Sequence, residues 1–311
     1  MLFTLDQIQQ ITGIIDFHSS YLIFQVLGKE SLSPFDKITL EQNGIDIASL
    51  VDKFPPYWQS YIFGRLTAQL NNYQAGKIEY NDFLKYIQRG QYTPLSNTEK
   101  QSYEIARQKS YGHIKGLGDR MKSQVNDIIT EETYRTREEY EKIISDEIKR
   151  GVAEKKSIQS IVSEIGHRAG EWNRDWGRIV ETEMQDIFNR GRAEQIKNDK
   201  GSDVLVYKET FQNACRHCIR LHLTNGIGSK PILFTLPQLE ANGDNIGKKV
   251  SDWKPTVSVV HPFCRCHLTY LPKDYVWDEE KKRFDVPKNY VPKVARASKV
   301  KITVGDKVFE V

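Results

Sequence analysis

The chain has no cysteine outside one short window. Its 311 residues include four cysteines, and all of them lie between positions 215 and 266. A secreted domain built on disulfides is usually smaller and spreads its cysteines along the chain. The window therefore predicts a metal site first. Four reduced, uncoordinated cysteines, or a disulfide formed in an oxidising environment, are the alternatives that the sequence leaves open.

Long apolar runs and a strong charge of one sign are also missing. The mean hydropathy is −0.57, and 45 basic residues stand against 41 acidic ones, for a net charge of +4. These values exclude a polytopic membrane protein, and so mild a balance does not by itself indicate a nucleic-acid binder. Polar residues interrupt the apolar residues 1–27, which contain no lysine or arginine. We therefore expect neither a signal peptide nor a membrane span. We expect the protein to act in the cytoplasm or inside a particle assembled there.

Apolar residues at helical spacing dominate residues 1–200, and a strong helix is expected over 172–196. Gly112, Gly116 and Gly118 interrupt the charged stretch 98–151, and each costs about 1 kcal/mol in a helix interior, so we expect a break or a kink there. A further short helix is expected over 157–166.

After residue 200 the pattern changes to short β-prone runs at 204–207, 257–260 and 268–271, and the last twelve residues alternate around a turn. The prediction is an α+β fold, with a mainly helical N-terminal two-thirds, a small zinc-pinned, β-containing C-terminal region and a terminal hairpin.

Two half-sites carry five metal-binding side chains. Cys215 and Cys218 are three residues apart, as are His261 and Cys264, and Cys266 follows two residues later. Sulfur with imidazole selects zinc over magnesium or calcium. Four of these five donors suffice to close a tetrahedral shell, which indicates a structural rather than a catalytic ion. A metal would also pin the long loop between the half-sites, whose length is otherwise unusual in a compact domain.

The second half-site and an upstream helix resemble the phage head morphogenesis family, typified by the Mu F-like minor head proteins. Residues 261–266 read His-Pro-Phe-Cys-Arg-Cys, similar to the family's His-Pro-Asn-Cys-Arg-Cys signature, with phenylalanine in place of the usual asparagine. Residues 176–183 read Trp-Gly-Arg-Ile-Val-Glu-Thr-Glu and resemble its Arg-Ile-x-x-Thr-Glu helix, and residues 189–192 read Asn-Arg-Gly-Arg, like the end of that helix. The resemblance covers residues 98–271.

This resemblance implies a structural minor head (capsid) protein of a tailed bacteriophage. It would act in head morphogenesis near the portal, lie in the virion, and occupy the host cytoplasm during assembly. We expect no enzyme. The alternative is a metal-dependent nuclease or an injected toxin-type enzyme, with Glu183 as a general base. Glu183 is interpreted here as a structural anchor, because no metal with an open coordination position is evident beside it.

The expected division is a helical docking region at 1–97, the Mu F-like domain at 98–272, and a basic tail with a terminal hairpin at 273–311. Residues 1–50 carry six acidic and two basic side chains, whereas residues 281–301 carry eight basic and one acidic. We expect residues 1–97 to bind the portal protein and other capsid or neck proteins through clustered aromatics, unless these fill a core of their own. The 281–301 segment is expected to contact packaged DNA, unless it is a solvated connector.

Overall fold

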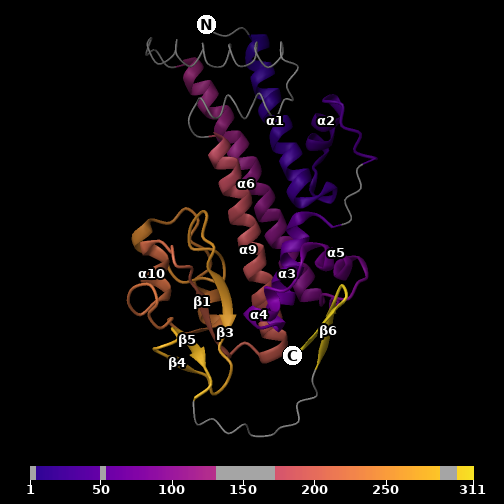
Figure 1. Cartoon of the computed structure of the whole chain (residues 1–311). Coiled ribbons are helices and arrows are strands. Elements are labelled where there is room, and N and C mark those ends of the chain that lie inside the picture. Colours follow the sequence, from indigo (N-terminus) through magenta and orange to yellow (C-terminus); the bar gives the residue numbers. More distant parts are fainter. Residues whose placement is uncertain (1–4, 50–53, 131–171, 288–299) are drawn as a thin grey trace. The chain divides into compact units, whose positions relative to one another are not determined.

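The chain has an α+β fold, as the sequence predicts. Figure 1 shows the computed structural model, which describes all residues except 1–4, 50–53, 131–171 and 288–299. The α-helices are α1 (Leu5–Leu27), α2 (Pro34–Gln42), α3 (Pro56–Gln69), α4 (Asn72–Ala75), α5 (Tyr80–Gln88), α6 (Asn97–Thr130), α9 (Trp172–Lys200), α10 (Arg216–His222) and α11 (Leu236–Ala241). The strands are β1 (Leu205–Glu209), β2 (Phe234–Thr235), β3 (His267–Tyr270), β4 (Val276–Asp278), β5 (Arg283–Asp285), β6 (Lys301–Val304) and β7 (Lys307–Glu310).

Several expectations fall on residues outside this description. The helix expected over 157–166 lies there, as does the greater part of the basic segment, 288–299. Within the described residues, no helix combines the length and the apolar character that crossing a membrane requires.

The chain forms two compact units, of which the first comprises residues 1–57 and 102–181. Its described core joins α1, α2 and the corresponding part of α6 around a fully buried carboxylate, Asp36. Ser20 and Tyr111 donate to it at 2.8 and 2.9 Å, and Lys115 pairs with it at 2.8 Å. Burial alone would raise the pKa of Asp36, but its hydrogen bonds with Lys115, Ser33 and Ser20 lower it to about 2. The carboxylate therefore stays charged and ties the three helices together.

Of the break or kink expected at the glycines of the charged stretch, the break is wrong, because α6 runs unbroken from Asn97 to Thr130. Packing against α1 accounts for the glycine at position 118. A Cβ at this position would lie 2.3 Å from the Ser19 hydroxyl on α1, so the glycine permits close approach of the two helices. Nothing lies within 4 Å of the corresponding points at Gly112 and Gly116. Their propensity cost is absorbed by a long helix with a well-packed buried face.

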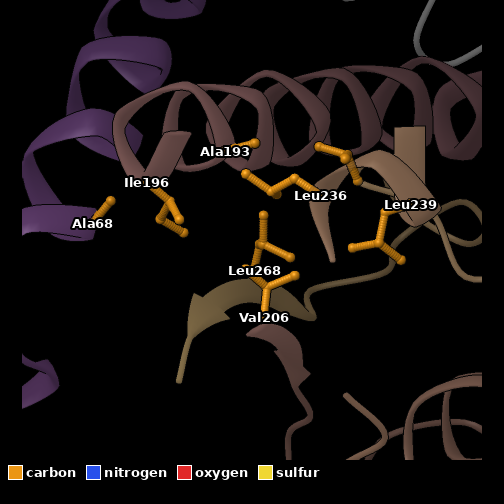
Figure 2. Packing of buried hydrophobic residues seen from close by; sticks show 8 residues of the cluster. Ala68, Ala193, Ile196, Val206, Leu236, Leu239 and Leu268 are labelled. Carbon is orange, nitrogen blue, oxygen red and sulfur yellow. The ribbon is translucent and has the colours of Figure 1, made fainter. Parts of the chain in front are cut away.

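The second unit comprises residues 58–101 and 182–311. Figure 2 shows its main core, in which side chains from α3, α9, α11 and the sheet converge. Val206 and Leu268 come from paired strands and are fully buried, and Leu236 and Leu239 cover them from α11. The core thus joins a helix from the first hundred residues to the region that carries the cysteines.

Two glycines bring α3 and α9 together within this unit. A Cβ on Gly64 would lie 2.1 Å from the Phe188 carbonyl oxygen, and one on Gly191 would lie 2.2 Å from the Tyr61 carbonyl oxygen. Backbone therefore meets backbone at this crossing. As a result, residues 58–97 group with the cysteine-bearing region, which differs from the division at residue 97 expected from composition.

Strand β1 is the centre of a three-stranded antiparallel sheet with the order β2-β1-β3. The run at 257–260 was expected to be a strand, and this is wrong: its residues form bends. The carbonyl oxygens of Val257 and Ser258 accept hydrogen bonds from the Lys208 ammonium at 2.6 and 3.1 Å. A side chain of β1 therefore satisfies backbone groups that a strand partner would otherwise bond.

The terminal hairpin is confirmed as the antiparallel pair β6–β7. Lys307 pairs with Glu79 at 2.9 Å and with Asp82 at 3.3 Å, beside α5, while Val304 and Phe309 are buried. A second hairpin, β4–β5, was not predicted. The terminal hairpin is therefore part of the second unit rather than a free tail.

Candidate metal centre

Five potential metal ligands meet where two short loops of the second unit come together. Cys215 is the residue that precedes α10, and Cys218 lies in its first turn. The second loop turns tightly, with the Cys264 amide donating to the His261 carbonyl at 3.1 Å, and it leads through Cys266 into β3. Both half-sites predicted from the sequence therefore supply side chains to one place.

The donor atoms form two groups of three that share Cys218. One contains Cys215, Cys218 and His261, the other Cys218, Cys264 and Cys266, and within each group all donor atoms lie within 4.8 Å of one another. The His261 Nε2 is 3.0 Å from the Cys215 sulfur and 3.3 Å from the Cys218 sulfur. The Cys218 and Cys264 sulfurs are 3.6 Å apart, and all four cysteines are free thiols. The cluster is able to hold a metal ion.

His261 is oriented for metal binding by its other ring nitrogen. Its Nδ1 lies 2.7 Å from the Pro262 carbonyl oxygen, which only accepts hydrogen bonds. The proton therefore resides on Nδ1, and Nε2 presents its lone pair to the two sulfurs, as in histidines that bind metals. The Trp253 ring stacks on His261 with centroids 6.1 Å apart and shields this side of the site.

The thiols do not ionise alike in the absence of an ion. Hydrogen bonds from Cys218 and Cys266 lower the pKa of the Cys264 thiol. The pKa of Cys218 is raised, first by its bonds to Cys264 and Cys266 and then by burial. The neighbouring thiols thus favour ionisation of Cys264 and oppose ionisation of Cys218. A dication is what would allow the others to ionise as well.

Helix α9 binds the second half-site over successive turns. Asn189 is fully buried; its Nδ2 donates to the Cys266 carbonyl at 3.1 Å, and its Oδ1 accepts from the Leu268 amide at 2.9 Å. Thr182 accepts from the Phe263 amide at 3.2 Å, and Arg192 donates to the Leu268 carbonyl. The helix thereby acts as the outer partner of β3 and of the turn before it. Hydrogen bonds thus join the helix that carries the Thr-Glu motif to the segment that carries the Cys-Arg-Cys motif.

The long loop between the half-sites is also held by groups other than a metal. Asn245, 5% exposed, donates to the carbonyls of Lys254 and Val260 at 3.0 and 3.4 Å and accepts from the Lys254 amide. Asn242 donates to the Pro255 carbonyl at 2.8 Å. Two amides therefore close the loop, so a metal adds to a framework that already exists.

The other polar residues near the cluster take separate positions. His217 stacks edge-on against Trp253, His267 lies 3.1 Å from a Glu209 carboxylate oxygen, and His222 is buried. Among the described residues, none of these histidines belongs to either donor group, and neither group contains a carboxylate. Glu183 is 7% exposed on α9.

Sequence reasoning did not single out Lys208, and it quoted Asn189 only as part of a motif without assigning it a role at the site. Lys208 lies two positions after the buried Val206 in β1, so the strand alternation already places it on the buried face. Asn189 lies seven residues after Thr182, two helical turns along the same face of α9. Both signals were present, but charged and amide side chains are usually assigned to the surface.

Phe263 has a backbone conformation that would suit asparagine, the usual residue at this position of the signature that residues 261–266 resemble. Its φ is +60°, in the left-handed region, and the side chain is 43% exposed. Asparagine tolerates this region because its short side chain bonds locally, whereas other L-residues lose about 1–2 kcal/mol there.

Phe263→Asn is therefore expected to raise the stability of the second unit by about 1 kcal/mol. Thermal unfolding of the metal-loaded chain measures this, with Val250→Asn as the control, because Val250 is 45% exposed and lies in a 3-10 helix. A stability gain at both positions, or a loss at Phe263 alone, would show that backbone strain is not the cause.

Comparisons with protein-family models, with curated proteins and with solved structures return no match to this chain.

Proposed function

We propose that this chain is a structural minor head protein of a tailed bacteriophage, acting in head assembly near the portal, with a structural zinc ion in its second unit. The observation that carries the proposal is the hydrogen bonding of α9 to the Cys-Arg-Cys block. In the family that the chain resembles, these two motifs occur in this order, with a cysteine pair between them. Their contact here gives the resemblance a physical reason.

Zinc fits the donor chemistry and the spacing. Zinc–sulfur and zinc–nitrogen bonds of about 2.3 and 2.0 Å give tetrahedral edges of about 3.8 Å between sulfurs and about 3.5 Å between sulfur and nitrogen. The Cys218–Cys264 distance is 3.6 Å, and the two sulfur–nitrogen distances are 3.0 and 3.3 Å. These three edges would have to open by only a few tenths of an ångström. Cys264 lies outside the first donor group, so its distance to Cys215 or to His261 exceeds 4.8 Å, and its sulfur would have to move inward by about 1 Å to complete the shell.

These three distances connect Cys215, His261, Cys218 and Cys264, and we assign these four as ligands. Cys266 is then a buried neighbour whose carbonyl oxygen is bonded to Asn189. The set closes a tetrahedral shell with three thiolates and one imidazole and leaves no position for a substrate or an activated water. This favours the structural role over the nuclease or toxin-type alternative, which requires an open position and an adjacent base.

The docking surface for the portal is proposed on α2 rather than on the aromatic cluster. Tyr57 and Tyr61 are 0% and 1% exposed, so these aromatics fill core positions. Phe35 and Ile38, one turn apart on α2, are 53% and 52% exposed. Exposed aromatic and aliphatic side chains of this kind are typical anchors of protein interfaces. The 281–301 segment remains the proposed contact for packaged DNA.

The test is incorporation into heads. Deleting residues 1–97 would be uninformative, because residues 58–97 belong to the second unit. The double variant Phe35→Ser, Ile38→Ser is expected to reduce the copies per particle at least tenfold in quantitative mass spectrometry of purified heads. Val250→Ser, at a comparably exposed valine in the second unit, serves as the control.

Absence of the parent chain from particles would refute the virion role, whereas unchanged incorporation of the double variant would refute only docking through α2.

A further inference from the structure

Lys208 is a buried cation without a carboxylate partner. It is 1% exposed, and its ammonium donates to two backbone carbonyls, those of Val257 and Ser258. Neutral carbonyls satisfy hydrogen bonds but do not offset a full charge. In the part of the chain that the structure describes, no acidic side chain lies within ion-pair distance of it. An uncompensated buried ammonium costs several kcal/mol, so its presence calls for a nearby negative charge.

The titratable groups around Lys208 show which of them could supply this negative charge. Asp186 on α9 lies close enough to act on Lys208, but it is already paired with Arg190 at 2.8 Å. His222 on α10 is uncharged at neutral pH, because burial lowers its pKa to about 3. What remains are the sulfurs of Cys264, Cys266 and Cys218, which act on Lys208 through space. The candidate metal centre is therefore the neighbour able to supply negative charge.

The sheet register explains this placement. Lys208 pairs with Leu268, which is fully buried on the same face, and Cys266 lies two residues before Leu268. Burial lowers the pKa of Lys208 to about 8, while the sulfurs and Asp186 act in the opposite direction. The ammonium bonds the Ser258 carbonyl, three residues before His261, so the geometry places it beside the second half-site.

We infer that Lys208 is the counter-ion of the metal centre and that its charge strengthens metal binding through space. The inference rests on the proposed zinc site. A dication with three thiolates and a neutral imidazole carries a net charge of −1, which one ammonium offsets. Lys208 would therefore act on the bound ion through its charge, without being one of its ligands. Its bonds to Val257 and Ser258 also connect the centre to the turn that the sequence suggested as a strand.

The experiment uses two neutral variants of the full chain. Lys208→Met keeps the length of the side chain, and Lys208→Gln keeps two N–H donors for the carbonyls. Zn²⁺ affinity is measured by competition with a chromophoric chelator, and thermal unfolding is recorded with and without Zn²⁺. Lys248→Met is the control. The Lys248 ammonium also donates to a backbone carbonyl, that of Asn242 at 3.3 Å, but it does so in an exposed position of the loop between the two half-sites.

We expect both Lys208 variants to bind Zn²⁺ at least tenfold more weakly than the parent, which corresponds to about 1.4 kcal/mol. Without metal, Lys208→Gln should be as stable as the parent or more stable, since the buried charge is gone and the amide can still bond the carbonyls. Lys208→Met also loses the hydrogen bonds to Val257 and Ser258, so it should be less stable than Lys208→Gln. The metal-induced rise in melting temperature should shrink in both variants and stay unchanged in the control.

Affinity within twofold of the parent, with equal destabilisation in the two metal states, would overturn the inference and leave Lys208 as a clamp for the turn at 257–258. Failure of Lys208→Gln to fold would overturn it too, because this variant removes the cost of burying the ammonium and keeps donors for the two carbonyls. If the parent itself binds no Zn²⁺, the proposed zinc site fails; if the parent binds and the variants match it, only the counter-ion role fails.

Discussion

Cys218→Ser is expected to abolish metal retention, whereas Cys266→Ser is expected to keep it. Cys218 is the donor common to both groups of three, so every four-ligand set that spans the two groups compactly includes it. Cys266 lies outside the set connected by the three short distances. A serine hydroxyl stays protonated at neutral pH and is a poor zinc ligand compared with a thiolate. Each variant replaces one sulfur atom by oxygen, so comparing the two distinguishes a metal ligand from a cysteine that only lies beside the site.

Metal content after dialysis against a weak chelator measures the first effect, and amide hydrogen exchange measures its structural result. Structural zinc sites contribute about 10–16 kcal/mol of binding free energy to small zinc-finger peptides. Here the separate core shown in Figure 2 supports the unit without the ion. We therefore expect Cys218→Ser to lose protection over residues 212–221 and 257–266 and to retain it in β1 and the adjoining part of α9. Full metal retention by Cys218→Ser, or its loss in Cys266→Ser, would contradict the assigned ligands.

Gly191→Ala is expected to damage the second unit strongly, as is Gly64→Ala on the other side of the same crossing. The Cβ added at position 191 would lie 2.2 Å from the Tyr61 carbonyl oxygen and 3.2 Å from the Arg65 amide nitrogen, both of them backbone atoms of α3. Because a backbone cannot rotate away as a side chain can, the two helices must separate. Overpacking of this kind costs about 1–3 kcal/mol or more, which exceeds the gain of about 1 kcal/mol that alanine brings in a helix.

Gly112→Ala is the control, because it is also in a helix interior and nothing lies within 4 Å of its added Cβ. It should be stabilising by roughly 0.5–1 kcal/mol. Chemical denaturation, followed separately for the two units by hydrogen exchange, distinguishes the two variants. Equal effects of the two substitutions would mean that the crossing of α3 and α9 tolerates expansion.

The elements that the sequence predicts well are those whose signal is local. The terminal hairpin follows from alternation around a turn, and α9 from its long apolar stripe. The fold class also follows from such patterns. Both metal half-sites were found because cysteine and histidine at three-residue spacing carry their chemistry in the local sequence.

The elements that sequence reasoning missed depend on partners distant in the chain. The run at 257–260 has the composition of a strand, but Lys208, about fifty residues earlier, takes two of its carbonyl oxygens. The glycines of α6 suggested a break, but one of them admits Ser19 of α1. Likewise, nothing local in residues 58–97 shows that Gly64 meets Phe188. In each case a tertiary contact decides against the local propensity.

X-ray absorption at the zinc edge, on chain purified under reducing conditions without added metal, tests the central claim most directly. The account predicts about one zinc per chain in a first shell of three sulfurs at about 2.3 Å and one nitrogen at about 2.0 Å. It also predicts that Cys266→Ser leaves this shell unchanged. Metal-free protein, a disulfide among the four cysteines, or a shell that includes water oxygen would contradict a closed structural zinc site.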